Sequence, residues 1–350
     1  MGKKLLFVGA GAIGCYLGSF LTRAGHDVTL VDPWAENVDT INRRGIAVTG
    51  PHEPFTATPK AVHLNDAQRL PRDFEIAFVA MKVYDTAWAT QLALRHLRED
   101  GYVVASENCW PDPVVAAVAG TPRSVGLVMS KIGVAMWKPG AVERGLEKGG
   151  SKGHDVFRAG EHDGTITKRT AELAEILKVV DGALATDNLW GERWSKLCAN
   201  SMGNPVQAMS NLGSVEIASS EAGRAITIHL AAESARVGLA LGYTIPKING
   251  APAEQWAAAD QRETYDALDR MLTPTSASSR NWKASMAQDV SKGRPTEIDH
   301  MNGYVVAQGR AKGVPTPVSA AIVETMHEIE AGARKPAAEN IPHVLRRAGV

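Results

Sequence analysis

Three glycines near the N-terminus have the spacing of a turn that binds phosphate groups. The pattern G-x-G-x-x-G spans Gly9–Gly14 and directly follows a short apolar run. Its first glycine permits a tight turn, its second lets the backbone approach a pyrophosphate, and its third lets a helix pack closely on a strand. The unpaired N–H groups of the following helix would face the phosphates. We therefore expect a dinucleotide to be bound by Gly9, Ala10, Gly11, Ala12, Ile13 and Gly14.

An acidic residue, Asp32, ends the second apolar run, where this type of turn needs a partner for the ribose. A carboxylate there accepts hydrogen bonds from the 2′- and 3′-hydroxyls and repels a 2′-phosphate. Residues 33–36 offer no lysine or arginine to hold such a phosphate, although Arg43 or Arg44 could fold back towards it. The sequence thus favours NAD as the cofactor, with NADP as the alternative.

A second set of polar residues, spaced four positions apart, consists of Lys196, Asn200 and Asn204. At this spacing one helix face would present an ammonium group and two amides. The flanking residues Trp194, Leu197 and Cys198 are apolar and indicate a mostly buried helix. A lysine in a closing cleft can polarise a ketone and give a proton to its oxygen as hydride reaches the carbon. The alternative is a lysine that extends to solvent beside two surface asparagines.

Two further polar residues follow apolar runs that are typical of strands. Lys82 comes after Phe74–Met81, and Asn108 lies just beyond Tyr102–Ser106. Ligands of parallel sheets bind outside the carboxyl ends of the strands, which makes both side chains candidates for ligand contact. The alternative is that both are solvated loop residues.

The segment Asn281–Asn302 contains another polar cluster. Ser285 lies near the start of one expected helix, and Thr296 precedes Glu297 in a cap-like position after a proline. Glu297 would therefore open the next helix. An acid in a first helical turn also simply complements the helix dipole, which is the alternative to a chemical role.

These residues need elements that position them, and the apolar pattern predicts such elements up to about Asp187. Strand-like runs and helical patterns alternate there, which indicates an α/β fold with a Rossmann-type, doubly wound parallel sheet. The glycine- and charge-rich residues 138–163 would form hairpins at the edge of this sheet. Beyond Asp187 we expect helices over Trp190–Leu212, Ser220–Leu241, Glu254–Leu272, Trp282–Val290, Glu297–Lys312 and Val318–Ala331. The expected domains are a dinucleotide-binding domain over 1–187, an all-α substrate and dimerisation domain over 188–335, and a loosely attached tail over 336–350.

The composition excludes several classes of protein. Among 350 residues, 44% are hydrophobic and 22% are charged, which is ordinary for a globular chain long enough for two domains. Basic and acidic residues number 38 each, so no net charge favours binding to nucleic acid or to an anionic membrane. The three cysteines have neither metal-ligand spacing nor a disulfide pattern, so we expect no metal and a cytoplasmic location.

Taken together, the motifs resemble those of the ketopantoate reductase family, NAD(P)H-dependent enzymes that reduce 2-dehydropantoate. The resemblance covers essentially the whole chain. It rests on GAGAIG at Gly9–Gly14, KL-x-x-N-x-x-x-N-P at Lys196–Pro205, and SM-x-x-D with GRPTEID-x-x-NG within Ser285–Gly303.

This resemblance implies roles for the candidate residues. Lys196 would be the general acid in reduction, and Glu297 would be the partner of a substrate hydroxyl or of Lys196 and would also reach the cofactor. The implied substrate contacts are Asn200, Asn204 and Ser285. On the cofactor side the resemblance implies Lys82, together with Asn108 near the nicotinamide and substrate.

Two positions differ from the pattern of this family. The asparagine near the nicotinamide is usually followed by glycine, in the sequence H-N-G, whereas here Glu107 precedes Asn108 and Cys109-Trp110 follow it. The family also often carries a basic residue near the position of Asp32, as NADPH requires.

We therefore expect a dehydrogenase or reductase that moves hydride between nicotinamide and a small 2-oxo acid/2-hydroxy acid pair, 2-dehydropantoate or a related compound. One alternative is an opine-type enzyme that condenses an amine with a 2-oxo acid. Another is a non-catalytic NAD(H)-binding sensor, which would have no use for the polar set around Lys196 and Glu297. The helical domain suggests a homodimer.

Overall fold

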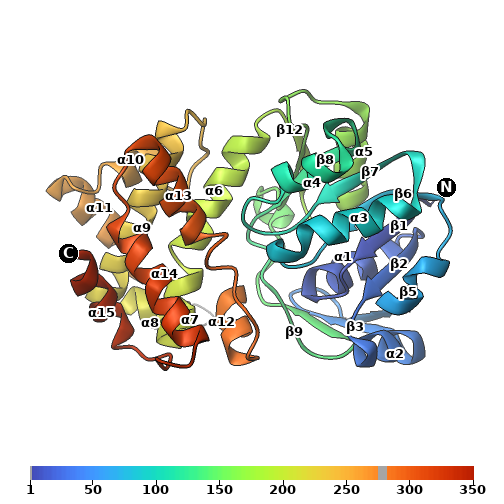
Figure 1. The fold of residues 1–350 in the computed structure, drawn as a ribbon, viewed down its shortest axis with the longest axis horizontal. Coiled ribbons are helices and arrows are strands. Elements are labelled where there is room, and N and C mark those ends of the chain that lie inside the picture. The colour runs from blue at the N-terminus through green and yellow to red at the C-terminus, as the bar shows by residue number, and fades with distance from the viewer. Residues whose placement is uncertain (1, 275–281) are drawn as a thin grey trace. The chain divides into compact units, whose positions relative to one another are not determined.

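The computed structural model describes residues 2–274 and 282–350, so that Asn281 of the polar cluster above lies outside the described residues. The chain divides into two compact units, Met1–Leu189 and Trp190–Val350 (Figure 1). The first unit is built on a sheet, and the second consists of helices. The fold class predicted from the sequence is confirmed.

The main sheet of the first unit has the strand order β12-β11-β8-β7-β6-β1-β2-β5. Its strands are β1 (Lys4–Val8), β2 (Asp27–Asp32), β5 (Lys60–His63), β6 (Phe74–Val79), β7 (Leu97–Ala105), β8 (Ser124–Met129), β11 (Phe157–Gly160) and β12 (Ala183–Thr186). All pairs from β8 to β5 are parallel, and only the pairing of β11 with β8 is antiparallel. The carboxyl ends of β7, β6, β1 and β2 therefore lie along one edge of the sheet.

Alternating apolar residues give this sheet two buried faces. Leu5 and Phe7 of β1 join the core on the side of α1 (Ala12–Arg23) and α5 (Lys168–Leu177). Leu6 and Val8 point to the opposite core, under α3 (Thr86–His96) and α4 (Asp112–Ala119). Because successive side chains of a strand point to opposite faces, the continuous apolar run predicts a strand covered on both sides.

The hairpins expected at the edge of the main sheet over residues 138–163 are found only in part, because β11 joins that sheet beside its edge strand and the hairpin before it does not. β9 (Val134–Lys138) and β10 (Ala141–Arg144) pair instead with β3 (Ile46–Thr49) and β4 (Phe55–Ala57) in a separate sheet of order β4-β3-β10-β9. This small sheet packs on α1, while α2 (Ala35–Arg44) packs on β2 and β5. Such pairing joins segments about ninety residues apart, a distance at which local sequence patterns carry no information.

The second unit is arranged around α9 (Glu221–Ala240), against which at least seven other helices pack. The remaining helices are α6 (Leu189–Ser201), α7 (Asn204–Ser210), α8 (Ser214–Ser219), α10 (Ala253–Ala257), α11 (Arg262–Leu272), α12 (Ser285–Ser291), α13 (Asn302–Lys312), α14 (Pro317–Glu330) and α15 (Asn340–Ala348). The single helix expected over Glu254–Leu272 is two helices, because the chain turns between α10 and α11. None of the helices in the described residues combines the length and apolar character needed to cross a bilayer.

The expectation of a loosely attached tail is wrong. The last segment forms α15, which packs on α7, α9 and α14. Ile341 and Val344 of this helix are buried, and the Nδ2 atom of the buried Asn340 donates to the carbonyl oxygen of Met209 at 2.8 Å. Arg347 forms ion pairs with two glutamates of α14. Only two apolar residues of α15 are buried, and the Ala- and Glu-rich composition after Ala331 therefore resembled that of a free end.

Candidate active site

The glycine turn has the geometry that its spacing predicts. Gly9 has φ +112°, and a Cβ atom there would lie 2.5 Å from the carbonyl oxygen of Ala80. A Cβ atom at Gly14 would lie 2.0 Å from the carbonyl oxygen of Gly9, so this glycine lets α1 pack against the turn. A Cβ atom at Gly11 would meet no atom of the described residues within 4 Å. The second glycine thus leaves its backbone open to a ligand while the other two are packed tightly, and the turn fits a dinucleotide.

Asp32 lies beside this turn at the carboxyl end of β2. Its Oδ2 atom accepts a hydrogen bond from the N–H of Ala10 at 2.6 Å, and Oδ1 accepts one from the N–H of Trp34 at 2.9 Å. The side chain is buried. These bonds fix the carboxylate next to the glycine turn.

A residue that sequence reasoning missed supports the same turn. Asn37 of α2 is fully buried, and its Nδ2 atom donates to the carbonyl oxygen of Ala10 at 2.9 Å. Its Oδ1 atom accepts from the N–H of Gly140, between β9 and β10. The amide therefore joins the glycine turn to the small sheet. No motif marks it, because its partners lie 27 and 103 residues away.

Lys82 and Asn108 lie at the same sheet edge as the turn and Asp32. Lys82 follows β6 and begins the 3₁₀ turn at Val83–Asp85, and Asn108 lies in the loop after β7; both side chains are partly exposed. Since β6 pairs with both β1 and β7, the four candidate positions follow four successive strands. The topology therefore gathers the cofactor-side candidates along one edge.

The loop after β7 holds a non-glycine residue in a left-handed conformation directly after Asn108. Cys109 is buried and has φ +63°, a backbone conformation that favours glycine. Just before it, the buried Glu107 accepts a hydrogen bond from the Oγ1 atom of Thr86 at 2.7 Å. The cysteine thus occupies a left-handed conformation at a cost of about 1 kcal/mol, which a glycine would not pay.

In the helical unit, α6 carries Lys196 and Asn200 and is held against α9 by a tryptophan. The Nε1 atom of Trp194 donates to the carbonyl oxygen of Ser234 at 2.9 Å. A Cβ atom at Gly238 would lie 2.1 Å from that nitrogen, so glycine in mid-helix permits the close approach. Lys196 is partly exposed, and Asn200, one turn later, is buried.

The single helix expected over Trp190–Leu212 is broken, so Asn204 does not share a helix with Lys196 and Asn200. α6 ends at Ser201, and α7 begins at Asn204 with Pro205 in its first turn. A proline cannot donate to the carbonyl four residues earlier, and its ring would clash with that carbonyl. The four-residue spacing therefore places only two of the three side chains on one helix face.

The structure brings Asn204 and Ser285 together. The Nδ2 atom of Asn204 donates to the Oγ atom of Ser285 at a distance of 3.5 Å. Next to it, the N–H of Ala284 donates to the Oε1 atom of Gln207 at 2.8 Å and ties the start of α12 to α7. Two side chains that are 81 residues apart thus offer polar atoms to the same region.

Glu297 does not open α13, contrary to the prediction. The N–H groups of His300 and Met301 donate to carbonyls three residues earlier, so the segment forms turns before α13 begins at Asn302. Thr296 does act as a local cap, because its Oγ1 atom accepts from the N–H of Ile298 at 3.3 Å. Glu297 is buried in this turn, five residues before the start of α13.

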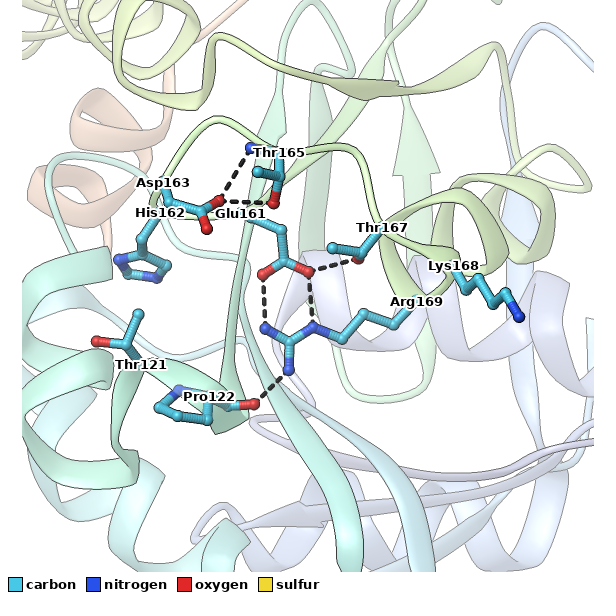
Figure 2. A pocket seen from close by; sticks show the side chains of 9 residues that line it. All are labelled: Thr121, Pro122, Glu161, His162, Asp163, Thr165, Thr167, Lys168 and Arg169. Carbon is cyan, nitrogen blue, oxygen red and sulfur yellow. Dashed lines mark hydrogen bonds and ion pairs between the residues drawn. The ribbon is translucent and has the colours of Figure 1, made fainter.

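A pocket elsewhere in the first unit contains none of the predicted site residues (Figure 2). Two of its charged groups pair with each other: Glu161 accepts hydrogen bonds from the guanidinium group of Arg169, and also from Thr167. Arg169 also donates to the carbonyl oxygen of Pro122. No group of three or more His, Cys, Asp or Glu side chains that could hold a metal occurs in residues 2–274 and 282–350. The candidate site residues are therefore those beside the glycine turn and the polar residues of the helical unit.

Comparison with known families identifies both parts of the chain. Residues 5–148 match the family model described as ketopantoate reductase PanE/ApbA, and residues 188–330 match its C-terminal model. The chain belongs to the ketopantoate reductase family. It is an NAD(P)-dependent oxidoreductase of that type, as the resemblance in its motifs predicted.

Individual members of the ketopantoate reductase family are distant in sequence. The chain is 24% identical over 322 residues to the 2-dehydropantoate 2-reductase of Pyrococcus horikoshii, covering 90% of this chain and 94% of that protein. It is 26% identical to the enzyme of the same name from Mesorhizobium japonicum, covering 93% and 97%.

Solved structures share the fold over nearly the whole chain. A ketopantoate reductase from Ralstonia eutropha has a TM-score of 0.75 at 23% identity, covering 94% of this chain and 99% of that one. A D-mandelate dehydrogenase, solved with NADH and anilino(oxo)acetate, has a TM-score of 0.76 at 19% identity with the same coverage.

Proposed function

We propose that the protein transfers hydride between NAD(H) and a 2-oxo acid/2-hydroxy acid pair, with 2-dehydropantoate or a related compound as the substrate. The observation that carries the proposal is the pairing of Asn204 with Ser285 in the helical unit whose α6 also presents Lys196. An amide, a hydroxyl and an ammonium group are the donors that a 2-oxo acid, with its carboxylate and adjacent carbonyl, requires.

Lys196 is the proposed proton donor in reduction and the acceptor of that proton in oxidation. An ammonium group can stabilise the negative charge that develops on the carbonyl oxygen and then protonate it. Asn200, Asn204 and Ser285 would hold the carboxylate and a substrate hydroxyl by hydrogen bonds. Glu297, buried in the turn before α13, would accept a hydrogen bond from a substrate hydroxyl or from Lys196.

The first unit supports a role for NAD rather than NADP. When bound, the nicotinamide group would give or accept the hydride. The glycine turn would hold the pyrophosphate, with Lys82 and Asn108 on the nicotinamide side. Asp32, fixed beside the turn, would bind the ribose hydroxyls and repel a 2′-phosphate.

The two arginines considered as partners of a 2′-phosphate lie at the far end of α2 from Asp32. Arg43 and Arg44 are the last two residues of this helix, whereas Asp32 precedes its first turn. At 1.5 Å per residue, they begin roughly 13 Å along the helix from its start. This separation favours NAD over NADP.

The names of the relatives guide the choice of substrate. The curated relatives are 2-dehydropantoate 2-reductases, while one structural neighbour is a D-mandelate dehydrogenase. Because Cys109 and Trp110 replace the usual glycine-containing sequence beside Asn108, we include aromatic and branched 2-oxo acids with 2-dehydropantoate. A homodimer is also proposed, since a structural neighbour from Staphylococcus aureus is described as a dimeric ketopantoate reductase.

The test measures cofactor binding and turnover in the same preparation. NADH and NADPH are titrated by fluorescence, and 2-dehydropantoate, branched and aromatic 2-oxo acids are then assayed with NADH, with and without added amine. We expect tighter NADH binding and amine-independent turnover of at least one acid. Tighter NADPH binding would overturn the role of Asp32. Turnover only with amine would indicate an opine-type enzyme, and NADH binding without any turnover would indicate a sensor.

A further inference from the structure

The break between α6 and α7 leaves one backbone carbonyl without its helical partner. In a continuous helix the carbonyl oxygen of Ser201 would accept from the N–H four residues later, but that residue is Pro205, which has none. Ser201 is fully buried, so water cannot replace this donor easily. A buried carbonyl in this position needs a donor from elsewhere in the protein.

Asn302 supplies that donor. Its Nδ2 atom donates to the carbonyl oxygen of Ser201 at 3.2 Å, and its side chain is 0% exposed. The bond joins residues 101 positions apart, from the end of α6 to the first residue of α13. This long-range hydrogen bond therefore replaces the helical hydrogen bond that Pro205 cannot donate.

This one amide connects the elements that carry the proposed chemistry. On one side, Ser201 directly follows Asn200 and ends the helix that presents Lys196. On the other side, Asn302 ends the turn that holds Glu297, which is closed by bonds from the N–H groups of Met301 and Gly303 to the carbonyl oxygen of Ile298. A shift of Asn302 would therefore change where α6 lies relative to the Glu297 turn.

We propose that Asn302 is a positioning residue, which fixes α6 with Lys196 and Asn200 against the turn that carries Glu297. This inference rests on the proposed function, because it assigns those three side chains to one reaction. Asn302 touches neither substrate nor cofactor in this role. Small displacements of reacting groups lower the rate strongly. Loss of the Asn302 amide should therefore lower turnover more than loss of a similarly buried amide elsewhere in this unit.

The test replaces the amide donor while keeping its shape. Asn302→Asp removes the donor to Ser201, and Asn340→Asp is the matched control. Asn340 is also buried at the start of a helix in this unit, and its Nδ2 atom also donates to backbone carbonyls, those of Met209 and Lys335. Thermal unfolding, NADH affinity, kcat, KM and the pH profile of kcat/KM are measured for both variants.

We expect Asn302→Asp to lower kcat about 10- to 100-fold and to shift the pH profile of kcat/KM, with NADH affinity unchanged. Asn340→Asp should change kcat less than about threefold, and it should lose less thermal stability, because the new carboxylate pairs with Arg334, which already donates to Oδ1 of Asn340. Asn302→Ala and Asn340→Ala form a second matched pair for the case in which the aspartates prevent folding.

Each other outcome decides against the inference in its own way. Equal turnover and pH profiles in the two variants, with an active wild type, would overturn the positioning role and leave the proposed function intact. If both Asn302 variants fail to fold while both Asn340 variants fold, the Asn302 amide serves stability only. Absence of wild-type turnover with intact NADH binding would remove the proposed function itself, and this inference with it.

Discussion

Lys196 projects from a helix whose neighbouring side chains, Trp194, Leu197 and Cys198, are all buried. Ser195 and Ala199 are partly exposed like Lys196, so one side of α6 is less buried than the side of Trp194 and Leu197. In the proposed function this lysine handles the proton, and its replacement therefore separates chemistry from cofactor binding.

We expect Lys196→Ala to lower kcat at least about 100-fold while NADH binds as tightly as before. The reason is that the glycine turn and Asp32, which would bind the cofactor, belong to the other unit. Steady-state kinetics and an NADH titration measure the two effects. The control is Lys312→Ala, an exposed lysine at the end of α13, which should change neither. Near-normal turnover of the Lys196 variant would remove its catalytic assignment.

Cys109 has a left-handed backbone conformation that residues with a side chain rarely adopt. Its positive φ favours glycine, and a β-branched residue is strongly disfavoured there. We expect Cys109→Gly to change the free energy of unfolding by less than about 1 kcal/mol, because relief of strain offsets lost packing. Cys109→Val should destabilise by more than about 2 kcal/mol. Chemical denaturation measures both, and equal effects of the two substitutions would contradict this explanation.

At the scale of elements, proline and glycine decide where helices end and how closely they pack. Pro205, in the first turn of α7, prevents α6 from continuing into it, and Gly238 lets α6 approach α9. Both effects can be read from residue types, but their consequence for Asn204 needs the surrounding structure. The same holds for α15, whose short apolar face is meaningful only because three other helices are present to cover it.

The packing of α15 leads to a stability prediction. Ile341 is buried, so Ile341→Ala should lower the free energy of unfolding by about 2–5 kcal/mol through lost burial and the cavity left behind. Arg346→Ala, on the exposed side of the same helix, should cost less than about 0.5 kcal/mol. Urea denaturation followed by circular dichroism measures both. A loosely attached end would give equal, small effects for the two substitutions.

At the scale of the whole molecule, a buried ion pair links acid pH to stability. Arg144 of β10 pairs with Asp181, just before β12, at 2.5 Å, and both side chains are almost fully buried. Burial acts to raise the pKa of the Asp181 carboxyl, but hydrogen bonds from the N–H groups of Gly150 and Gly182 and from Arg144 outweigh it and hold the pKa below its usual value. The small sheet is thereby fixed to the edge of the main sheet.

Because the folded pKa of Asp181 lies below the unfolded value of about 4, its contribution is present above that pH and is lost as pH falls through the folded pKa. We expect Asp181→Asn to cost about 3–5 kcal/mol at pH 7, since it leaves Arg144 buried with an unmatched charge. The difference from wild type should shrink only below about pH 4. Denaturation curves from pH 3 to pH 8 measure this trend.

The control for this prediction is a surface pair. Asp66 lies 3.4 Å from Arg69, and both side chains are more than half exposed. Asp66→Asn should therefore change the unfolding free energy by less than about 1 kcal/mol at any of these pH values. A pH-independent loss in Asp181→Asn would show that packing, and not the carboxylate, provides the stability.

The sequence alone determined the features that depend on neighbouring residues. Apolar runs, glycine spacing and alternation set the Rossmann-type unit, its dinucleotide turn and the position of Asp32, because each depends mainly on residues close in the chain. The polar motifs of the helical unit were also visible, and they carried the family assignment. Local pattern is sufficient where the partners are neighbours in sequence.

The tertiary structure decided the features that join distant segments. It separated Asn204 from the helix of Lys196 and paired it with Ser285, placed Glu297 in a turn, and assembled the small sheet from segments far apart. It also revealed Asn37 and Asn302, whose partners no spacing rule indicates. The physical reason is the same throughout: a buried polar group must find its hydrogen-bond partner wherever the fold provides one.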